Sequence, residues 1–340
     1  MGTQICLRVL FAGSPGIAVP ALEALAASGM EDVCEVVGVL TNADTPKGRR
    51  GTPEPTEVGV AATVLSAALG ERGKPGFVIL KPEKLGAEVR EAVSALKPDL
   101  LVSFAYGRIF GPRFLGLFPM GGINVHPSLL PRYRGPTPIQ AAILSRDAET
   151  GISIQRIALQ MDAGDILTQE RLSLTGRETA ASLSGIAARK SAVLLAALIR
   201  GFAGGGIAGI PQNHAEAVYC HLLKKEDGRI DWNAGVMEID ARIRAFTPWP
   251  LCLTRHGEAD LYILEGRPWE EDAASKAVNS GGTVTEPPGT VLGIDKGRGI
   301  LIQTGNGIYA AEKLQYRTKK ALDWRSFLNG APGFTGSRLT

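Results

Sequence analysis

The sequence predicts an α/β protein with a doubly wound, mostly parallel sheet, followed by a small β-barrel domain. Three observations lead to this prediction. Short apolar runs without alternation recur in the first two thirds of the chain, as in strands that are buried on both faces. Segments with apolar residues at helical spacing separate these runs. Beyond residue 210 the pattern changes to short strands punctuated by glycine and proline.

The first domain alternates strand and helix. Residues 7–12 form an apolar run that ends at a glycine turn, and residues 20–27 then read as a helix. The turn, Gly13 to Gly16, lacks the G-x-G-x-x-G spacing of a dinucleotide site, so a tight turn is favoured. The further strands are expected at 33–41, 99–104, 122–125 and 151–158, and the further helices at 54–69, 82–96 and 180–199.

The best domain boundary is the glycine-dense run GFAGGGIAG at residues 201–209. We therefore expect a first domain at 1–203, a Gly-rich linker at 204–214 and a second domain at 215–332. Expected elements of the second domain are strands at 228–232, 251–254, 261–264, 289–294, 299–304 and 307–314, a helix at 236–244 and a polar loop at 270–288.

Composition bounds the class of protein. With 340 residues, the chain is long enough for about two domains, and 44% hydrophobic with 21% charged residues is ordinary for a globular protein. A net charge of +3 gives no general argument for nucleic acid binding. The four cysteines lack metal-ligand spacing and are expected to be reduced and mostly structural. No secretory signal or apolar membrane span is found, so we expect a cytoplasmic protein without a membrane partner.

The most informative segment is INVHPSLLPRYRGPTPIQ at residues 123–140, followed by MDAGD at 161–165. It holds an amide, Asn124, an imidazole, His126, and a carboxylate, Asp162. Such a trio can run acyl transfer, because the amide stabilises an oxyanion, the imidazole moves a proton and the carboxylate orients the imidazole. On an extended segment Asn124 and His126 project to one face, roughly 7 Å apart. Spacing alone leaves open a turn asparagine and a satisfied core histidine.

The wider segment resembles the formyltransferases that use 10-formyltetrahydrofolate. The matching residues are Asn124, His126, Ser128 to Arg132, Arg134, Gly135, Pro138 to Gln140, Gly151 and Asp162 to Asp165. The resemblance implies that Asn124, His126 and Asp162 are catalytic, that the first domain is a Rossmann-like formyltransferase domain, and that no metal is required. It also implies folate contacts from Phe104, Ala105, Tyr106, Gly107, Ser128, Leu129, Leu130 and Pro131.

Similarity over nearly the whole chain narrows the resemblance to the branch whose acceptor is methionyl-initiator tRNA. The further matching runs are FAGSPGIAVPALEAL, RIDWNAGVMEIDARIRAFTPWP and GTVLGIDKGRGILIQTGNGIYAAEKLQYRTKKALDW. That branch carries an OB-like C-terminal barrel that contacts the tRNA. We expect the protein to act in translation initiation, as a monomer.

Two basic regions are the candidate tRNA contacts. The first is a glycine-containing loop with Lys47, Arg49 and Arg50, and the second contains Lys313, Arg317, Lys319 and Lys320. A charge run is more often a solvated face, so the second region is weak evidence by itself. The main alternative is a sugar-nucleotide N-formyltransferase, which would need neither basic region. A non-catalytic folate- or RNA-binding protein is a third possibility, against which the intact trio argues.

Overall fold

The structure is a computed structural model that describes residues 6–46, 51–204, 207–270 and 286–340. The chain divides into two compact units. Unit 1 comprises residues 1–138, 149–173 and 183–221, and unit 2 comprises residues 139–148, 174–182 and 222–340. The domain boundaries expected from the sequence, after residues 203 and 214, stay a prediction. By contacts, unit 1 continues to His221.

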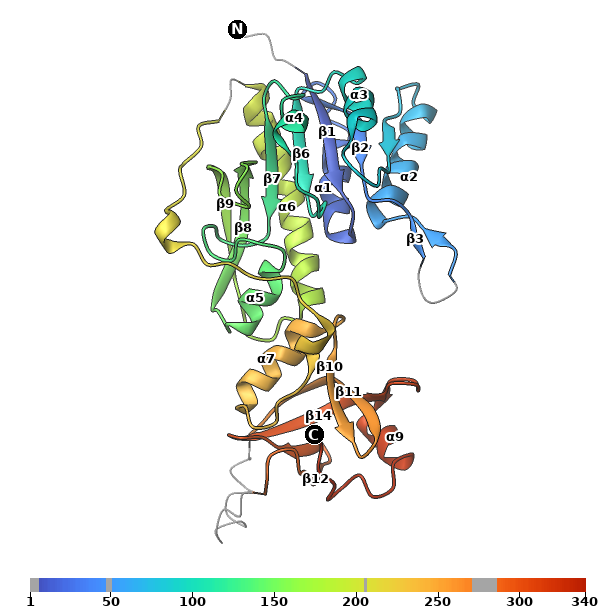
Figure 1. The fold of residues 1–340 in the computed structure, drawn as a ribbon, viewed down its shortest axis with the longest axis vertical. Helices are drawn as coiled ribbons and strands as arrows, with labels where there is room; N and C mark the ends of the chain where they lie inside the picture. Colours follow the sequence, from blue (N-terminus) through green and yellow to red (C-terminus); the bar gives the residue numbers. More distant parts are fainter. Residues whose placement is uncertain (1–5, 47–50, 205–206, 271–285) are drawn as a thin grey trace. The chain divides into compact units, whose positions relative to one another are not determined.

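Unit 1 is built on a seven-stranded sheet with the order β5-β2-β1-β6-β7-β8-β9 (Figure 1). Its strands are β1 (Leu7–Gly13), β2 (Cys34–Leu40), β5 (Val78–Leu80), β6 (Leu100–Phe104), β7 (Gly122–His126), β8 (Glu149–Arg156) and β9 (Ile166–Ser173). The first five of these pair in parallel, whereas β8 and β9 are antiparallel additions beside β7. The strand order reverses between β1 and β6, which is where ligands bind in doubly wound sheets.

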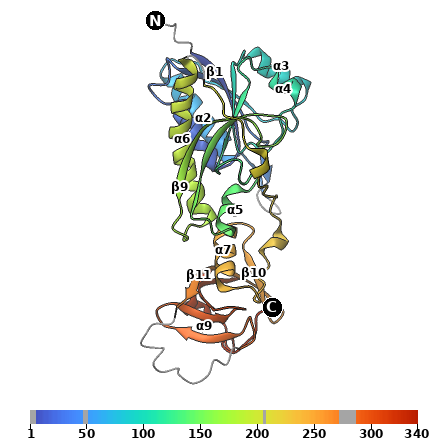
Figure 2. The ribbon, with the colours of Figure 1, turned by 90° about the vertical axis from the view of Figure 1, so that its left-hand side faces the viewer.

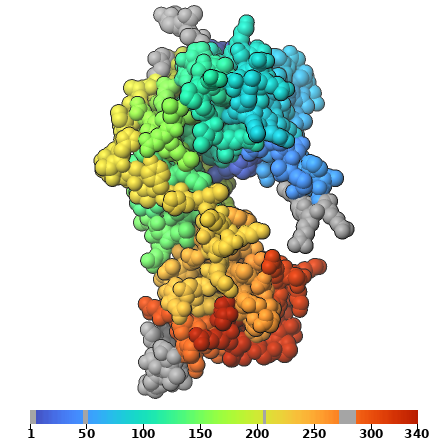
Figure 3. All heavy atoms as spheres, viewed as in Figure 1, coloured from blue at the N-terminus to red at the C-terminus, as the bar shows by residue number. Residues whose placement is uncertain are grey.

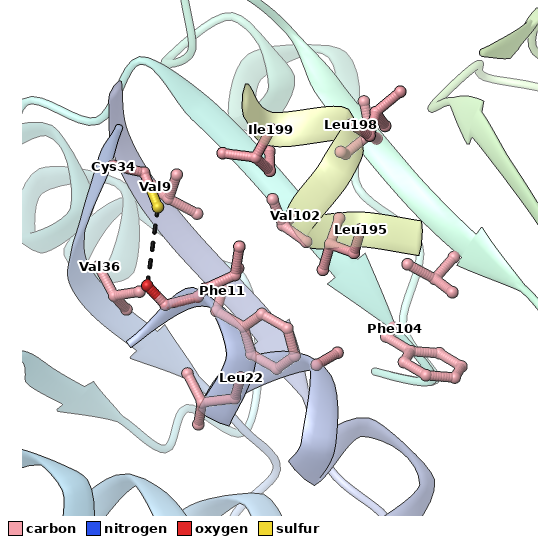
Figure 4. Packing of buried hydrophobic residues seen from close by; sticks show 14 of the residues in the cluster. Val9, Phe11, Leu22, Cys34, Val36, Val102, Phe104, Leu195, Leu198 and Ile199 are labelled. Atoms are coloured by element: carbon pink, nitrogen blue, oxygen red, sulfur yellow. Dashed lines mark hydrogen bonds between the residues drawn. The ribbon is translucent and has the colours of Figure 1, made fainter. Parts of the chain in front are cut away.

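Helices cover both faces of this sheet (Figure 2). They are α1 (Val19–Leu25), α2 (Glu57–Glu71), α3 (Ala87–Ala95), α4 (Pro112–Leu115) and α6 (Ala180–Ala203). On one face Leu22 of α1 and Leu195 and Ile199 of α6 pack against Phe11 and Val102 of the strands (Figure 4). On the other face, α3 and α4 cover a second cluster that includes a stacked Tyr106–Phe110 pair. The predicted doubly wound, mostly parallel sheet is therefore confirmed.

Helix α6 is long and apolar enough to cross a membrane, judged by length and composition alone. In unit 1, however, its Leu195, Leu198 and Ile199 are at most 4% exposed and belong to the core beneath the sheet. The apolar face of this helix is therefore accounted for by packing.

Unit 2 contains a six-stranded antiparallel sheet. Its strands are β10 (Cys252–His256), β11 (Ala259–Trp269), β12 (Val291–Asp295), β13 (Gly299–Gln303), β14 (Ile308–Tyr316) and β15 (Leu322–Asp323), and its helices are α5 (Pro138–Leu144), α7 (Val236–Phe246) and α9 (Trp324–Asn329). Residues 336–340 bridge the two ends of this sheet. Thr340 exchanges backbone hydrogen bonds with Arg255 of β10, and Val291 of β12 donates to Ser337. This closure supports the predicted barrel.

One predicted strand was wrong, and several observed elements were not predicted. Residues 228–232 were predicted to form a strand, but a 3₁₀ turn, η3 (Lys225–Gly228), is followed by a single bridge between Arg229 and Leu253. Strands β5 and β9 and helices α4, α5 and α9 were not predicted. Of the predicted polar loop at 270–288, residues 271–285 lie outside the described residues.

Two of the four cysteines, Cys34 and Cys252, are buried, whereas Cys6 is exposed. All four are free thiols: Cys6, Cys34, Cys220 and Cys252. Burial raises the pKa of Cys34 and of Cys252 to about 12, so both stay protonated and unreactive near neutral pH.

Candidate active site

The candidate site lies where β6 and β7 end side by side. Phe104 of β6 pairs with Val125 of β7, so the residues that follow both strands leave the sheet at the same carboxyl edge. Asn124 and His126 are the third and fifth residues of β7 and therefore share one face of the strand. His126 is buried, and Asn124 is half-buried. The strand thus presents both groups as the sequence predicts.

Asp162 reaches this edge from the loop that joins β8 to β9. Its Oδ1 lies 3.4 Å from Asn124 Nδ2, and its Oδ2 lies 3.7 Å from His126 Nδ1. Gln155 Nε2 donates to Oδ1 at 3.0 Å, and the Gly135 backbone N–H donates to Oδ2 at 2.8 Å. Each carboxylate oxygen therefore accepts hydrogen bonds, which fix its position. The structure thus brings the three predicted residues together.

The histidine tautomer follows from its second contact. Nε2 of His126 lies 2.9 Å from the Tyr133 carbonyl oxygen, which can only accept a hydrogen bond. Nε2 therefore carries a proton and donates a hydrogen bond to that carbonyl. Nδ1, which faces Asp162, is left as the nitrogen that can take up and release a proton.

Glycine lets the Asp162 loop approach the sheet. A Cβ on Gly164 would lie 1.9 Å from the Arg156 carbonyl oxygen, which is backbone that cannot move aside. Asp162 itself has a φ of 51°, a left-handed conformation that costs energy in a residue other than glycine. The loop is thus held in a strained conformation close to β8.

We expect Gly164→Ala to destabilise the protein by about 1–3 kcal/mol, the usual cost of overpacking, and to reduce turnover by displacing Asp162. Gly70→Ala in α2 is the matched control, because a Cβ there meets nothing within 4 Å. That control should be neutral or stabilising by about 0.5–1 kcal/mol. Thermal unfolding of both variants checks this, and equal melting temperatures would contradict it.

The eight predicted folate contacts fall into two groups. Phe104, Tyr106, Ser128 and Leu130 are buried, and the Ser128 hydroxyl is committed to the Arg132 carbonyl at 2.6 Å. Ala105 and Gly107 are exposed, and Leu129 and Pro131 are half-buried. The exposed and half-buried residues can touch a ligand directly, whereas the buried residues shape the chain at the ends of β6 and β7. Asn42 Nδ2 donates to the Tyr106 carbonyl at 3.1 Å and ties the loop after β6 to the end of β2.

The predicted tRNA contacts lie in different places. Lys47, Arg49 and Arg50 are outside the described residues, and the flanking β3 (Thr45–Pro46) and β4 (Pro53–Glu54) pair with each other. In unit 2, Lys313 pairs with Glu265 and Arg317 with Asp260, both at 2.8 Å. Lys319 lies over the ring of Tyr316, and Lys320 is exposed. Two of the four charges are thus already partnered within unit 2.

Several residues beside the trio were not predicted. Gln155, which binds Asp162, pairs across the sheet with Asn124, and an inward residue of a neighbouring strand was the signal that could have found it. Arg134 was noted only as a matching position, yet it is fully buried. Gln212 lies in the predicted linker and gave no local signal. The segment 207–221 that carries it lies on the surface of unit 1 (Figure 3) and pairs with it through Ile210–Ile166 and Tyr219–Arg134.

Comparison with known proteins defines the class. The profile named Formyl transferase matches residues 7–198, and the profile named Formyl transferase, C-terminal domain, matches residues 222–332. The chain belongs to the formyl transferase family.

Its relatives within the family are methionyl-tRNA formyltransferases. The Treponema denticola protein of that name is 46% identical over 330 residues, which are 96% of this chain and 98% of the relative. The chain therefore belongs among the methionyl-tRNA formyltransferases, as the resemblance predicted.

Solved structures share the fold at lower identity. HypX from Aquifex aeolicus in complex with tetrahydrofolic acid has a TM-score of 0.59 at 16% identity, and the match covers 97% of this chain but only 48% of HypX. An N-formyltransferase from Helicobacter canadensis in complex with folinic acid and dTDP-3-aminofucose has a TM-score of 0.61 at 18% identity, over 90% of this chain and 99% of that one. These matches establish the fold alone.

Proposed function

We propose that this protein transfers the formyl group of 10-formyltetrahydrofolate to the amino group of methionine on initiator tRNA, and so acts in translation initiation in the cytoplasm. The observation that carries the catalytic assignment is the cluster of Asn124, His126 and Asp162 at the carboxyl edge of β7. The relatives named for methionyl-tRNA support the acceptor.

Each member of the trio has a role that follows from its contacts. The folate supplies the formyl carbon; a bond forms from that carbon to the methionine nitrogen, and the bond to the folate nitrogen breaks. The Asn124 amide has two N–H donors, of which one faces Asp162, so the other can donate to the developing oxyanion. His126 Nδ1 receives the proton that the attacking amine loses, since Nε2 is committed to Tyr133, and gives a proton to the folate nitrogen as that nitrogen leaves. Asp162 orients His126 and stabilises its charged form.

The acceptor is tested by incubation of the full-length protein with 10-formyltetrahydrofolate and either methionyl-initiator tRNA or an amino-sugar nucleotide. We expect formylation of the methionyl-tRNA only. Formylation of the sugar nucleotide alone would reverse the assignment, and the absence of transfer to both would favour a binding protein.

The ion pairs in unit 2 predict which lysines bind RNA. Lys319→Ala/Lys320→Ala removes charges that have no acidic partner among the contacts described, whereas Lys313→Ala/Arg317→Ala removes charges that are already paired. If this surface meets tRNA, the first variant should raise the KM for tRNA and flatten its salt dependence by about one unit of log–log slope for each phosphate that the variant no longer binds. The second variant should have a smaller effect. Equal slopes in both variants and the wild type would remove unit 2 from the interface.

The basic loop is tested in the same way. Replacement of Lys47, Arg49 and Arg50 together by alanine should raise the KM for tRNA, flatten the salt slope and leave the KM for folate unchanged. Because the two basic regions lie far apart in the sequence and contact the RNA separately in this proposal, their effects on binding free energy should be close to additive.

A further inference from the structure

Gln212 is a buried amide with both ends engaged. It is 6% exposed, and its Oε1 accepts two hydrogen bonds from Arg134, at 3.1 Å from Nε and 2.7 Å from Nη2. The guanidinium has donors only, so it dictates which end of the amide is the oxygen. The amide nitrogen must then point the other way.

That nitrogen points into the loop that carries Asp162. Gln212 Nε2 donates to the backbone carbonyl oxygens of Asp162 at 2.9 Å and of Gly164 at 2.7 Å, and it lies 3.0 Å from Gln155 Oε1. Gln155 in turn donates through Nε2 to Asp162 Oδ1. One side chain thus holds the backbone on both sides of Ala163 and also orients the amide that binds the carboxylate.

Arg134 is itself fixed. Its side chain is fully buried, its Nη1 donates to the Tyr219 hydroxyl at 3.1 Å, and its Nη2 lies 3.1 Å from His214 Nδ1. These contacts leave the guanidinium a single orientation, which it imposes on Gln212. The chain of contacts therefore runs from Arg134 through Gln212 and Gln155 to the Asp162 carboxylate.

We propose that Gln212 is a positioning residue for Asp162, and that the buried Arg134 guanidinium fixes the orientation in which its amide acts. Gln212 touches neither His126 nor Asn124 in the contacts described, so it acts on the reaction through the Asp162 loop. The left-handed backbone of Asp162 needs such an external restraint, because the residue does not favour this conformation by itself. The inference rests on the catalytic role proposed for Asp162.

Two substitutions separate the two ends of the amide. Gln212→Glu keeps an oxygen toward Arg134 but places a second oxygen against the Asp162 and Gly164 carbonyls, where it repels them. Gln212→Met fills similar volume and makes no hydrogen bond at either end. We expect kcat to fall about 10–100-fold in both, as is usual when a residue behind an active-site group is removed, and to fall further in the glutamate variant. KM for folate and for tRNA should change little, because binding surfaces are untouched.

Gln303→Glu is the matched control. Gln303 lies in β13 of unit 2, and its Nε2 also donates to two backbone carbonyls, those of Thr304 and Gly307. The same chemical change there should leave kcat unchanged. Gln212→Glu retains the acceptor for Arg134, so it should remain folded even if Gln212→Met does not.

The decisive experiment is a double-mutant cycle of Gln212→Glu with Asp162→Asn, in which the single-turnover rate of each variant is measured. If Gln212 acts through Asp162, its replacement should cost far less in the Asp162→Asn background than in the wild type. Wild-type kcat in Gln212→Glu, or a loss that adds in full to that of Asp162→Asn, would overturn the positioning role while the proposed function stands. Normal turnover of Asp162→Asn by itself would overturn the proposed function instead.

Discussion

Asn124→Ala and His126→Ala are each expected to lower kcat by at least about 100-fold, the effect of losing one oxyanion donor in other acyl transfer sites. Removal of the Asn124 side chain leaves Asp162 Oδ1 with a hydrogen-bond donor, because Oδ1 retains its hydrogen bond from Gln155. His126→Ala removes the imidazole whose Nδ1 lies 3.7 Å from the Asp162 carboxylate.

The histidine variant requires a stability control. It removes the 2.9 Å contact from Nε2 to the Tyr133 carbonyl, which then keeps the weaker 3.7 Å contact from the Cys220 thiol, and the loss of a buried hydrogen bond costs about 0.5–1.5 kcal/mol. Circular dichroism and thermal unfolding should therefore accompany the rates, with Asn306→Ala and His221→Ala as substitutions of the same residue types elsewhere in the chain. A folded variant of Asn124 or His126 that retains most of its turnover would exclude that residue from the chemistry.

Asp162→Asn is expected to reduce kcat roughly 1,000-fold or more, by comparison with the asparagine replacement of the aspartate in Ser-His-Asp triads. The hydrogen-bond partners of its two oxygens are donors: the Gly135 N–H, Gln155 Nε2 and Asn124 Nδ2. An asparagine offers only one acceptor and must turn its NH₂ toward a donor on one side. The variant therefore loses a hydrogen bond as well as the charge.

KM for folate should change little in Asp162→Asn, because the exposed folate candidates lie on the loops after β6 and β7. Steady-state kinetics with varied folate at saturating tRNA measure this. A raised folate KM with normal turnover at saturation would make Asp162 a binding residue instead.

The regular elements could be predicted from sequence because burial imposes a pattern on them. The apolar runs that became β1, β2 and β6 are buried on both faces, and α6 carries its apolar residues at helical spacing. Strand β5 has three residues and α4 has four, which is too few for either period to be visible. Strand β9 lies at the edge of the sheet and reads as polar.

The trio could be predicted because its members lie in one distinctive segment. Gln212 could not, since it reaches Asp162 only after residues 207–221 have paired with unit 1. A glycine-rich composition correctly indicates freedom in the unfolded chain but not what the following residues will bind. Three-dimensional proximity of a single glutamine leaves no pattern in the sequence.

The closure of the unit 2 barrel by residues 336–340 affects how the protein is made. These residues follow every strand of the barrel in the sequence, so β12 and the Arg255–His256 end of β10 keep unpaired edges until the closing segment has left the ribosome. Unpaired strand edges are templates for pairing with other chains. During synthesis the second unit therefore exposes strand edges that can aggregate until its last residues are made. The first unit has largely local strand–helix connections and can fold earlier.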